Sequence, residues 1–366
     1  MTENRKIRVA ITHGDTNGIG YELIFKTFAE PEMLELCTPI VYGSPKVAAY
    51  HRKALGIEAN FSIISSADEA KDGRVNMLAT FDDEVKVELG IPSEEAGHAA
   101  LTALDKAVVD FHDHLYDVLV TAPVHADSIS NHGLQFRSQA NYIGECFAER
   151  DQAMTILVND SMRVGLMTDN VAVKDIATKI TQESLTEKIK LFAQALKRDF
   201  RISNPRVAVL ALNPTPGAEE RDVIKPVIEQ LADNQVNAFG PYTADNFFSN
   251  SLYNDFDGVL AMYHDQGMTP FLTLTPEGGV EMVSGLPIVC TSTLQGASYD
   301  IAGKNVADEG ALRRAIYLAM DVCRNRAMYD EPFENPLSKL YHEKRDESEK
   351  VRFAIPKKHE NSIKER

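Results

Sequence analysis

Short apolar runs alternate with longer segments of helical period along most of the chain. The apolar runs predict strands, and the segments with apolar residues every three or four positions predict helices. Alternation of this kind is typical of an α/β fold with a mixed, mostly parallel sheet and helices on both faces. We expect strands at 6–12, 39–42, 117–121, 155–158, 163–168, 206–212 and 258–263, and helices at 21–28, 93–112, 182–200, 219–233 and 308–324.

The length of 366 residues favours two domains, because a single hydrophobic core rarely grows beyond roughly 250–300 residues. From residue 329 onward the chain becomes highly charged and loses its aliphatic periodicity. A polar segment of this composition cannot bury enough apolar surface to form a core. We therefore expect residues 329–366 to form a C-terminal arm and tail outside both domains.

The charge and the cysteines exclude several classes of protein. The formal net charge is −16, which disfavours nucleic acids and anionic membranes as partners but leaves a small-molecule substrate open. The chain has no run of about 18 apolar residues and no signal-peptide pattern near its start. Its four cysteines are far apart and lack C-x-x-C spacing, which predicts buried free thiols in a reducing cytoplasm. We expect a cytoplasmic protein.

Four of the predicted strands end in polar, glycine-rich or proline-rich segments: 13–20 (HGDTNGIG), 122–125 (APVH), 213–217 (NPTPG) and 264–267 (HDQG). Ligands of open α/β sheets gather at the carboxyl ends of strands, so these segments predict a cleft. The glycines of the first segment allow a ligand to approach the backbone, but a purely structural tight turn explains them equally well. His264 beside Asp265 is able to bind metal or move a proton, and the alternative is a histidine that only caps its turn. Isolated histidines such as His51 are predicted to be solvated.

These segments belong to a longer series of motifs in the order and spacing of a known family. The motifs are ITHGDTNGIGYE at 11–22, TAPVH at 121–125, ALNP at 211–214, AMYHDQG at 261–267, GLP at 285–287, TS at 291–292 and IAGKNVAD at 301–308. In these residues the chain resembles the 4-hydroxythreonine-4-phosphate dehydrogenase (PdxA) family. The resemblance implies the two-domain fold of the isocitrate and isopropylmalate dehydrogenases, with a first domain of residues 1–125 plus about 290–328 and a second of 126–289.

The resemblance also implies an activity and an assembly. It implies a homodimer with active sites across the interface, NAD and a divalent metal as cofactors, and oxidation of 4-phosphohydroxy-L-threonine in pyridoxal phosphate biosynthesis. The retained catalytic positions are Asp245, His264 and Asp265, and the candidate cofactor-binding residues are Gly14, Gly18 and Asn213. We expect a cleft lined by Asn213, Asp245 and His264.

When the family's metal ligands are matched to this chain, two of the three positions carry other residues. The family holds its metal with three histidines, of which the chain retains His264, with Asp169 and Thr215 at the other two positions. A threonine hydroxyl is a poor replacement for an imidazole ligand. We therefore predict that metal binding is weak or absent.

The substrate-binding positions have changed as well. The family's Gly-His-Thr-Glu motif reads Ser-Gln-Ala-Asn at 138–141, and the loop after Asn213-Pro214 is shorter than the family's glycine-rich version. A phosphate dianion needs cationic or backbone donors, so the replacements predict an apolar or repulsive pocket. The diverged positions are Gln139 and Ala140 for His and Thr, Leu272, Glu281 and Cys290 for Lys, Asn and Arg, and Ala126 for the lysine after TAP.

Three hypotheses follow from this pattern. The first is an NAD-dependent dehydrogenase that acts on a changed, non-phosphorylated substrate. The second is a non-catalytic homologue that binds a ligand or pairs with a genuine family enzyme, and the third is the family's usual reaction by an unusual site. The replacements concentrate at the site while strands and turns persist, which indicates an altered function on a maintained fold. We expect no useful turnover of 4-phosphohydroxy-L-threonine.

Overall fold

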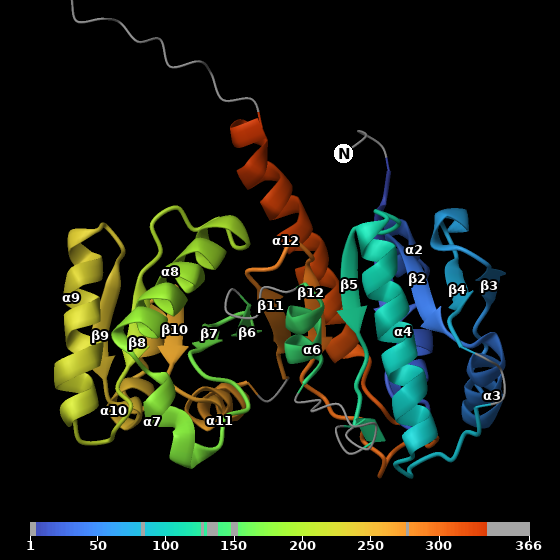
Figure 1. The fold of residues 1–366 in the computed structure, drawn as a ribbon. Helices are drawn as coiled ribbons and strands as arrows, with labels where there is room; N and C mark the ends of the chain where they lie inside the picture. Colours follow the sequence, from blue (N-terminus) through green and yellow to red (C-terminus); the bar gives the residue numbers. More distant parts are fainter. Residues whose placement is uncertain are drawn as a thin grey trace, which may run out of the picture.

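Twelve strands form one sheet in the order β3-β4-β2-β1-β5-β12-β11-β6-β7-β10-β8-β9 (Figure 1). The structure is a computed structural model, and it describes residues 5–81, 85–125, 128–129, 138–147, 153–275 and 278–334. The strands are β1 (Ile7–Thr12), β2 (Cys37–Gly43), β3 (Phe61–Ile64), β4 (Val75–Ala79), β5 (Val118–Thr121), β6 (Met154–Val158), β7 (Arg163–Leu166), β8 (Val207–Leu210), β9 (Ala238–Tyr242), β10 (Gly258–Ala261), β11 (Val280–Ser284) and β12 (Cys290–Thr293).

Helices cover the sheet and connect its parallel strands. They are α1 (Gly20–Thr27), α2 (Pro31–Leu36), α3 (Pro45–Leu55), α4 (Glu94–His112), α6 (Gln139–Cys146), α7 (Ile176–Lys179), α8 (Gln182–Arg198), α9 (Lys225–Asp233), α10 (Ala244–Ser249), α11 (His264–Leu274) and α12 (Gly310–Glu334). A π-helical turn, η3 (Glu220–Ile224), precedes α9, and short 3₁₀ turns lie at η1 (Ala67–Glu69), η2 (Val173–Asp175) and η4 (Leu252–Asp255).

The sheet consists of two parallel blocks joined by antiparallel pairs. The first block runs from β3 to β12 and the second from β7 to β9. Between them, β11 is antiparallel to β12 and β6, and β6 is antiparallel to β7. The predicted α/β class with a mixed, mostly parallel sheet is therefore confirmed. In Figure 1 the arrowheads of β5 and β10 both point to the lower side of the view, so the carboxyl ends of these strands lie on the same side.

Local sequence explains where several helices begin. The Ser93 side chain accepts a hydrogen bond from the backbone N–H of Ala96, which satisfies a free donor at the start of α4. Thr181 and Ser184 form a reciprocal capping box at the start of α8. Both helices were predicted from their apolar periodicity, and their predicted positions are confirmed.

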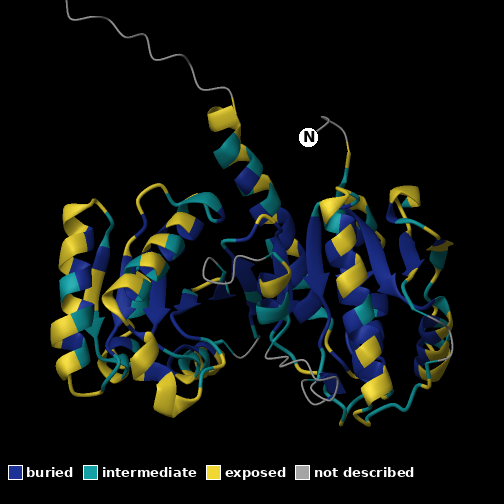
Figure 2. Ribbon diagram, viewed as in Figure 1, coloured by how far each residue is buried: buried dark blue, intermediate teal, exposed yellow. Residues whose placement is uncertain are grey.

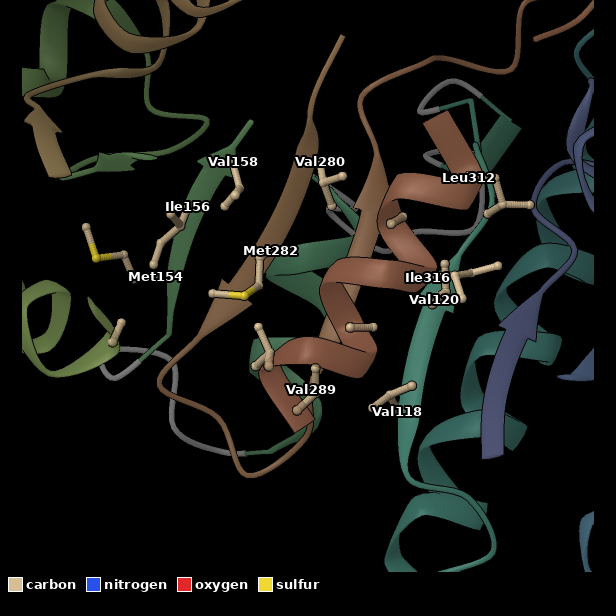
Figure 3. Close-up of a cluster of buried hydrophobic side chains, with 14 of the residues drawn as sticks. Val118, Val120, Met154, Ile156, Val158, Val280, Met282, Val289, Leu312 and Ile316 are labelled. Atoms are coloured by element: carbon tan, nitrogen blue, oxygen red, sulfur yellow. The ribbon is translucent and has the colours of Figure 1, made fainter. Parts of the chain in front are cut away.

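The centre of the molecule is built on α12, which packs against β5, β11 and β12. Figure 3 shows Ile316 of this helix near Val118 and Val120, with Met282 lying towards Ile156, and Figure 2 shows that the central strands are buried. Arg326 donates to the buried Asp199 carboxylate at 2.7 Å and to the carbonyl oxygens of Leu286 and Ile288, which anchors α12 to its neighbours. Burial of this side of the helix is the main source of its stability.

Two predictions, about the end of the last helix and about the thiols, need correction. The helix expected to end at residue 324 continues to Glu334, because polar side chains of α12 keep contacting the protein past the predicted end: Arg326 pairs with Asp199, and Asp330 pairs with Arg198. The rest of the predicted tail lies outside the described residues. Cys37 and Cys290 are buried as expected, but Cys146 is exposed because α6 buries a different face. The predicted domain boundary near residue 290 falls between β11 and β12, which pair directly, and the division into two domains stays a prediction.

Candidate functional site

The turns after β1 and β5 are joined by backbone contacts. The N–H of Asp15 donates to the carbonyl oxygen of Pro123 at 2.9 Å, and a Cβ added at Gly14, whose φ is +75°, would lie 2.3 Å from the same oxygen. A Cβ at Gly18 would lie 2.8 Å from the carbonyl oxygen of Ala297. Both glycines therefore make room for neighbouring backbone, which supports the structural explanation of this turn. Their role in cofactor binding stays a prediction.

Side chains add to this junction. The Tyr299 hydroxyl donates to the Asp15 carboxylate at 2.6 Å, and the N–H of Asn17 donates to its other oxygen at 2.8 Å. The Tyr299 ring stacks on His125 with centroids 5.0 Å apart. His51, which was expected to be solvated, is 1% exposed and contacts the Thr16 carbonyl oxygen through Nε2 at 2.7 Å. The first two glycine-rich and proline-rich segments thus form a packed, hydrogen-bonded unit.

The turns after β8 and β10 form a second unit. The Gln266 amide donates to the Ala211 carbonyl oxygen at 2.7 Å. Glu220 accepts hydrogen bonds from the N–H groups of Asn213 at 2.8 Å and Gly217 at 2.6 Å, and its carboxylate also contacts the Asn213 side chain. Burial acts to raise the pKa of Glu220, but these donors outweigh it and hold the pKa below its usual value. The backbone donors of Asn213 and Gly217 in this turn are therefore already bonded to the Glu220 carboxylate.

The retained catalytic candidates lie at the starts of two helices. His264 is the first residue of α11, and its Nδ1 lies 2.9 Å from an Asp265 carboxylate oxygen. Asp245 lies in the first turn of α10, where the Thr243 hydroxyl and the Asn246 N–H lower its pKa. Neither of the two cavities described below has Asn213, Asp245 or His264 among its described lining residues. The cleft expected to be lined by these three residues therefore stays a prediction.

The former metal positions do not fit a three-ligand site within this chain. Asp169 accepts hydrogen bonds from the Thr155 hydroxyl at 2.9 Å and the Asn141 amide at 3.4 Å. Thr215 is exposed on the turn after β8, and His264 contacts Asp265. Among the described residues, no group of three His, Cys, Asp or Glu side chains is placed to hold a metal ion. We derive no catalytic step through a metal, and weak metal binding stays a prediction.

Two neighbouring cavities open where the two blocks of the sheet meet. The first has a volume of about 140 Å³ and is lined by Ala140, Asn141, Thr155, Asp169 and Lys188 among others; we call it the Asp169 cavity. The second has a volume of about 250 Å³, and we call it the Glu281 cavity. Its lining combines the end of β5 and the start of α6 with α11, β11 and the segment at the end of β12, and consists of Pro123, Val124, Ser138, Gln139, Met268, Glu281, Ser292, Thr293, Leu294, Gln295 and Gly296.

Glu281 is the strongest electrostatic feature of the second cavity. It lies on β11 opposite Ser292 of β12. Burial, followed by the Asp169 carboxylate, raises the pKa of its carboxyl group to about 7, against an opposing effect of His264. Two other residues predicted from the sequence, Asp169 and His264, are therefore close enough to act on the charge of Glu281.

The other diverged substrate positions are placed differently. The Gln139 amide donates to the Ala122 carbonyl oxygen at 3.1 Å, and Gln139 lines the Glu281 cavity. Ala140 lines the Asp169 cavity. Leu272 is 45% exposed on α11 and Cys290 is buried in β12, and neither is among the described lining residues of the two cavities; Ala126 lies outside the described residues.

Several lining residues were not anticipated. Lys188 of α8 reaches the Asp169 cavity from a helix that sequence analysis treated only as amphipathic, and its ammonium group donates to the Ala153 carbonyl oxygen at 2.6 Å. Thr293 and Gln295 line the Glu281 cavity. They follow the TS motif by one and three positions, which is the signal that could have drawn attention to them.

Comparison with known proteins agrees with the motifs. No helix in the described ranges is long and apolar enough to cross a membrane. A 4-hydroxythreonine-4-phosphate dehydrogenase of Bacteroides thetaiotaomicron is 48% identical over 96% of this chain and 98% of its own length, and one of a Sulfurihydrogenibium species is 32% identical over 87% and 99%. The crystal structure of a 4-hydroxythreonine-4-phosphate dehydrogenase from Burkholderia phymatum superposes with a TM-score of 0.71 at 28% identity, covering 87% of this chain and 99% of that one. The family model of the pyridoxal phosphate biosynthetic protein PdxA matches residues 35–319, and the chain belongs to this family.

Proposed function

We propose that this chain is an NAD-dependent oxidoreductase of the PdxA family whose site takes a small, non-phosphorylated substrate. The observation that carries the proposal is the lining of the Glu281 cavity. It contains a carboxylate where the family resemblance implies Asn, and no Lys or Arg among the residues that the structure describes there. The relatives are named for a substrate that carries a phosphate group.

The acidic residues at this cavity disfavour binding of a phosphate group. Each unit of negative charge about 5 Å from a carboxylate is opposed by about 3 kcal/mol at an effective dielectric constant of about 20. A phosphate dianion near Glu281 and Asp169 would meet this opposition from both residues. The two positions where the resemblance implies cationic partners carry Leu272, which is exposed, and Cys290, which is buried. A neutral or cationic ligand meets no such opposition.

We assign the retained His264 as the general base that takes the proton of a substrate hydroxyl. Asp265 orients its ring through a contact to Nδ1. NAD, when bound, supplies the acceptor for a hydride. One observation favours the second candidate, a non-catalytic homologue that binds a ligand or pairs with a genuine family enzyme. The backbone donors of Asn213 and Gly217 are already used by Glu220, so the turn after β8 does not offer them to a cofactor in this conformation.

An assay of NADH formation separates the hypotheses. We expect turnover of 4-phosphohydroxy-L-threonine far below one per second, the lower end of the usual range for enzymes. Non-phosphorylated hydroxy amino acids and amino alcohols, tested in parallel, are expected to be the better substrates. Turnover of the phosphorylated compound near one per second would contradict the proposal, and absence of any turnover with NAD binding undetectable would favour the non-catalytic candidate.

Restoring the family residues tests the two losses separately. Asp169→His combined with Thr215→His is expected to recover a bound metal ion, measured by elemental analysis, with little gain in turnover of the phosphorylated compound. Substrate positioning and metal binding act independently, so activity needs both. Adding Gln139→His, Leu272→Lys, Glu281→Asn and Cys290→Arg is expected to be required. Substantial activity from the first two changes alone would show that the substrate pocket had been intact.

We also propose a homodimer in which His264 lies near the partner subunit, on the basis of the family resemblance. Sedimentation equilibrium is expected to give a mass of two chains. A monomer at micromolar concentration would contradict this proposal.

A further inference from the structure

We propose that a third cavity, at the amino ends of β3 and β4, binds an α-amino acid with an apolar side chain. This cavity has a volume of about 280 Å³, and we call it the Phe61 cavity. The proposal adds a second site to the proposed function and does not depend on it. It rests on three features: an apolar inner wall, two opposite charges at the mouth that the protein leaves unpaired, and a frame that holds both in place.

The Phe61 cavity is separate from the candidate functional site. Phe61 and Val75 are the first residues of β3 and β4, and these strands run parallel to β2 and β1 at one end of the sheet (Figure 1). The lining therefore lies at the amino ends of these strands, whereas the turn that carries Gly14 and Gly18 follows the carboxyl end of β1. None of its described lining residues also lines the Asp169 or the Glu281 cavity.

The inner wall of the cavity is apolar. It is formed by Phe25 of α1, Phe28 directly after this helix, Leu34 of α2, and the strand residues Phe61 and Val75. Phe25, Phe28 and Val75 are buried, and the rings of Phe25 and Phe61 are parallel to within 9° with centroids 6.4 Å apart. Packed aromatic side chains of this kind offer a preformed surface that favours an apolar group over water.

Two residues of opposite charge lie at the mouth. Glu58 comes from the segment after α3, and Arg74 comes from the segment before β4. Arg74 donates a long hydrogen bond of 3.4 Å to the Ser62 hydroxyl. Within the ranges that the structure describes, neither charge forms an ion pair, and the Glu58 carboxylate accepts no hydrogen bond. Both are therefore available to a ligand, and Asn60 adds an amide that donates and accepts.

The charges decide the class of ligand. A ligand with only a carboxylate is attracted by Arg74 and repelled by Glu58, and a ligand with only an ammonium group meets the reverse. A molecule that carries both groups pairs with both residues at once. The ammonium and carboxylate of an α-amino acid lie on one carbon atom, so its side chain is left to enter the apolar part of the cavity. A volume of about 280 Å³ suits one such molecule.

The mouth is held in place by contacts outside the cavity. Arg52 of α3 donates to the Ala59 carbonyl oxygen at 3.0 Å, and its guanidinium carbon lies 5.8 Å from the centre of the Phe61 ring. In the parallel pairing of β3 with β4, Phe61 is opposite Val75, which brings the segment that carries Glu58 beside Arg74. Because these groups are positioned before a ligand arrives, binding costs little ordering of the protein.

The test is a binding measurement on the full-length protein without NAD. The probes are L-phenylalanine, 3-phenylpropionate, which lacks the ammonium group, phenethylamine, which lacks the carboxylate, and glycine, which lacks the apolar side chain. Each is titrated by calorimetry. Exposed charge pairs are screened by water, so we expect weak binding of L-phenylalanine, about fivefold tighter than that of either singly charged analogue, and no detectable binding of glycine. Equal affinities for L-phenylalanine and either analogue, or no detectable binding of L-phenylalanine, would overturn the proposal.

Variants locate the binding. Arg74→Gln and Glu58→Gln remove one charge each, and each is expected to weaken L-phenylalanine binding about fivefold. Arg74→Gln should also weaken binding of 3-phenylpropionate and strengthen that of phenethylamine, and Glu58→Gln should do the reverse. Arg221→Gln and Glu229→Gln are the matched controls, since these side chains are 72% and 67% accessible on η3 and α9, and they are expected to leave binding unchanged.

The variants also give the result that would contradict the site. Cooperative thermal unfolding shows whether Arg74→Gln and Glu58→Gln are folded, and both positions are exposed, so we expect wild-type stability. Unchanged affinity for L-phenylalanine in both folded variants would place the amino acid elsewhere on the protein and overturn the proposal.

Discussion

Two neighbouring regions of the sheet differ in how their carboxylates are surrounded. One is formed by the turns after β1 and β5, and the other is the Glu281 cavity. In the turns, the Asp15 carboxylate accepts from Tyr299 and Asn17, and the space beside Gly14 is filled by the Pro123 carbonyl. In the cavity, burial and the Asp169 carboxylate raise the pKa of the Glu281 carboxyl group, and His264 opposes this shift. The Asp15 carboxylate is therefore used within the protein, although Thr12, His13 and Thr16 of the same region keep buried side-chain atoms without a described partner, whereas the Glu281 carboxylate lines a cavity.

This difference separates two roles of the family motifs. A motif whose polar atoms are all used by the protein maintains the fold, so its substitution should change stability. A region that keeps unpartnered acceptors around a cavity is where substitution should change binding. We therefore expect substitutions in the turns to change stability and substitutions in the Glu281 cavity to change binding, and the predictions below test that division from the largest expected effect to the smallest.

Gly14→Ala is expected to lower the free energy of unfolding by about 3 kcal/mol or more, because the new methyl group would overlap the Pro123 carbonyl oxygen. Gly73→Ala is the matched control: Gly73 has φ of +73°, close to the +75° of Gly14, but no atom within 4 Å of the added Cβ. It should show only the backbone strain of about 1 kcal/mol. Equal losses in urea unfolding would show that steric contact with Pro123 does not matter.

The packed region should also be sensitive to acid. Burial lowers the pKa of His13, whose ring stacks on Tyr21 with centroids 5.3 Å apart, to about 3. Its unfolded pKa is about 6.5, so the unfolded state binds a proton first and stability falls as the pH drops from about 6.5 towards 3. Between pH 7 and pH 5 the expected loss from this residue is about 2 kcal/mol. His13→Asn should reduce the pH slope of urea unfolding; an unchanged slope would contradict the assignment.

The cavity should show the opposite pH dependence. The folded pKa of Glu281 is raised to about 7, above its unfolded value, so this residue lowers stability as the pH rises from about 4.5 to 7. Glu281→Gln is neutral throughout, and is expected to raise the free energy of unfolding by about 1–2 kcal/mol at pH 8 and to change it little at pH 5. Thermal unfolding at both pH values measures this, with Glu229→Gln as control. Destabilisation by Glu281→Gln at pH 8 would show that the carboxylate has a partner.

The sequence by itself determined most of the regular elements. Strands with continuous apolar runs, such as β1 and β5, and helices with a clear period and cap, such as α4 and α8, were predicted because local propensity and burial pattern agree in them. Strands β3, β4, β9, β11 and β12 and helices α2, α3, α6, α7, α10 and α11 were not predicted. The residues of β12, CTST, carry hydroxyls that look exposed in the sequence, but the strand is buried and the Thr291 hydroxyl donates to Ala315 of α12.

The sequence also determined which side chains at the family positions had changed, but only the tertiary structure decided what the changes mean. Glu281 and Gln139 line one cavity, whereas Leu272 is exposed and Cys290 is enclosed in the sheet. Burial, electrostatic coupling and unpartnered oxygens depend on segments that are distant along the chain and meet only when the sheet is assembled. For that reason the sequence could only predict the loss of a phosphate site, and the packing around Glu281 decided which of these positions share one cavity.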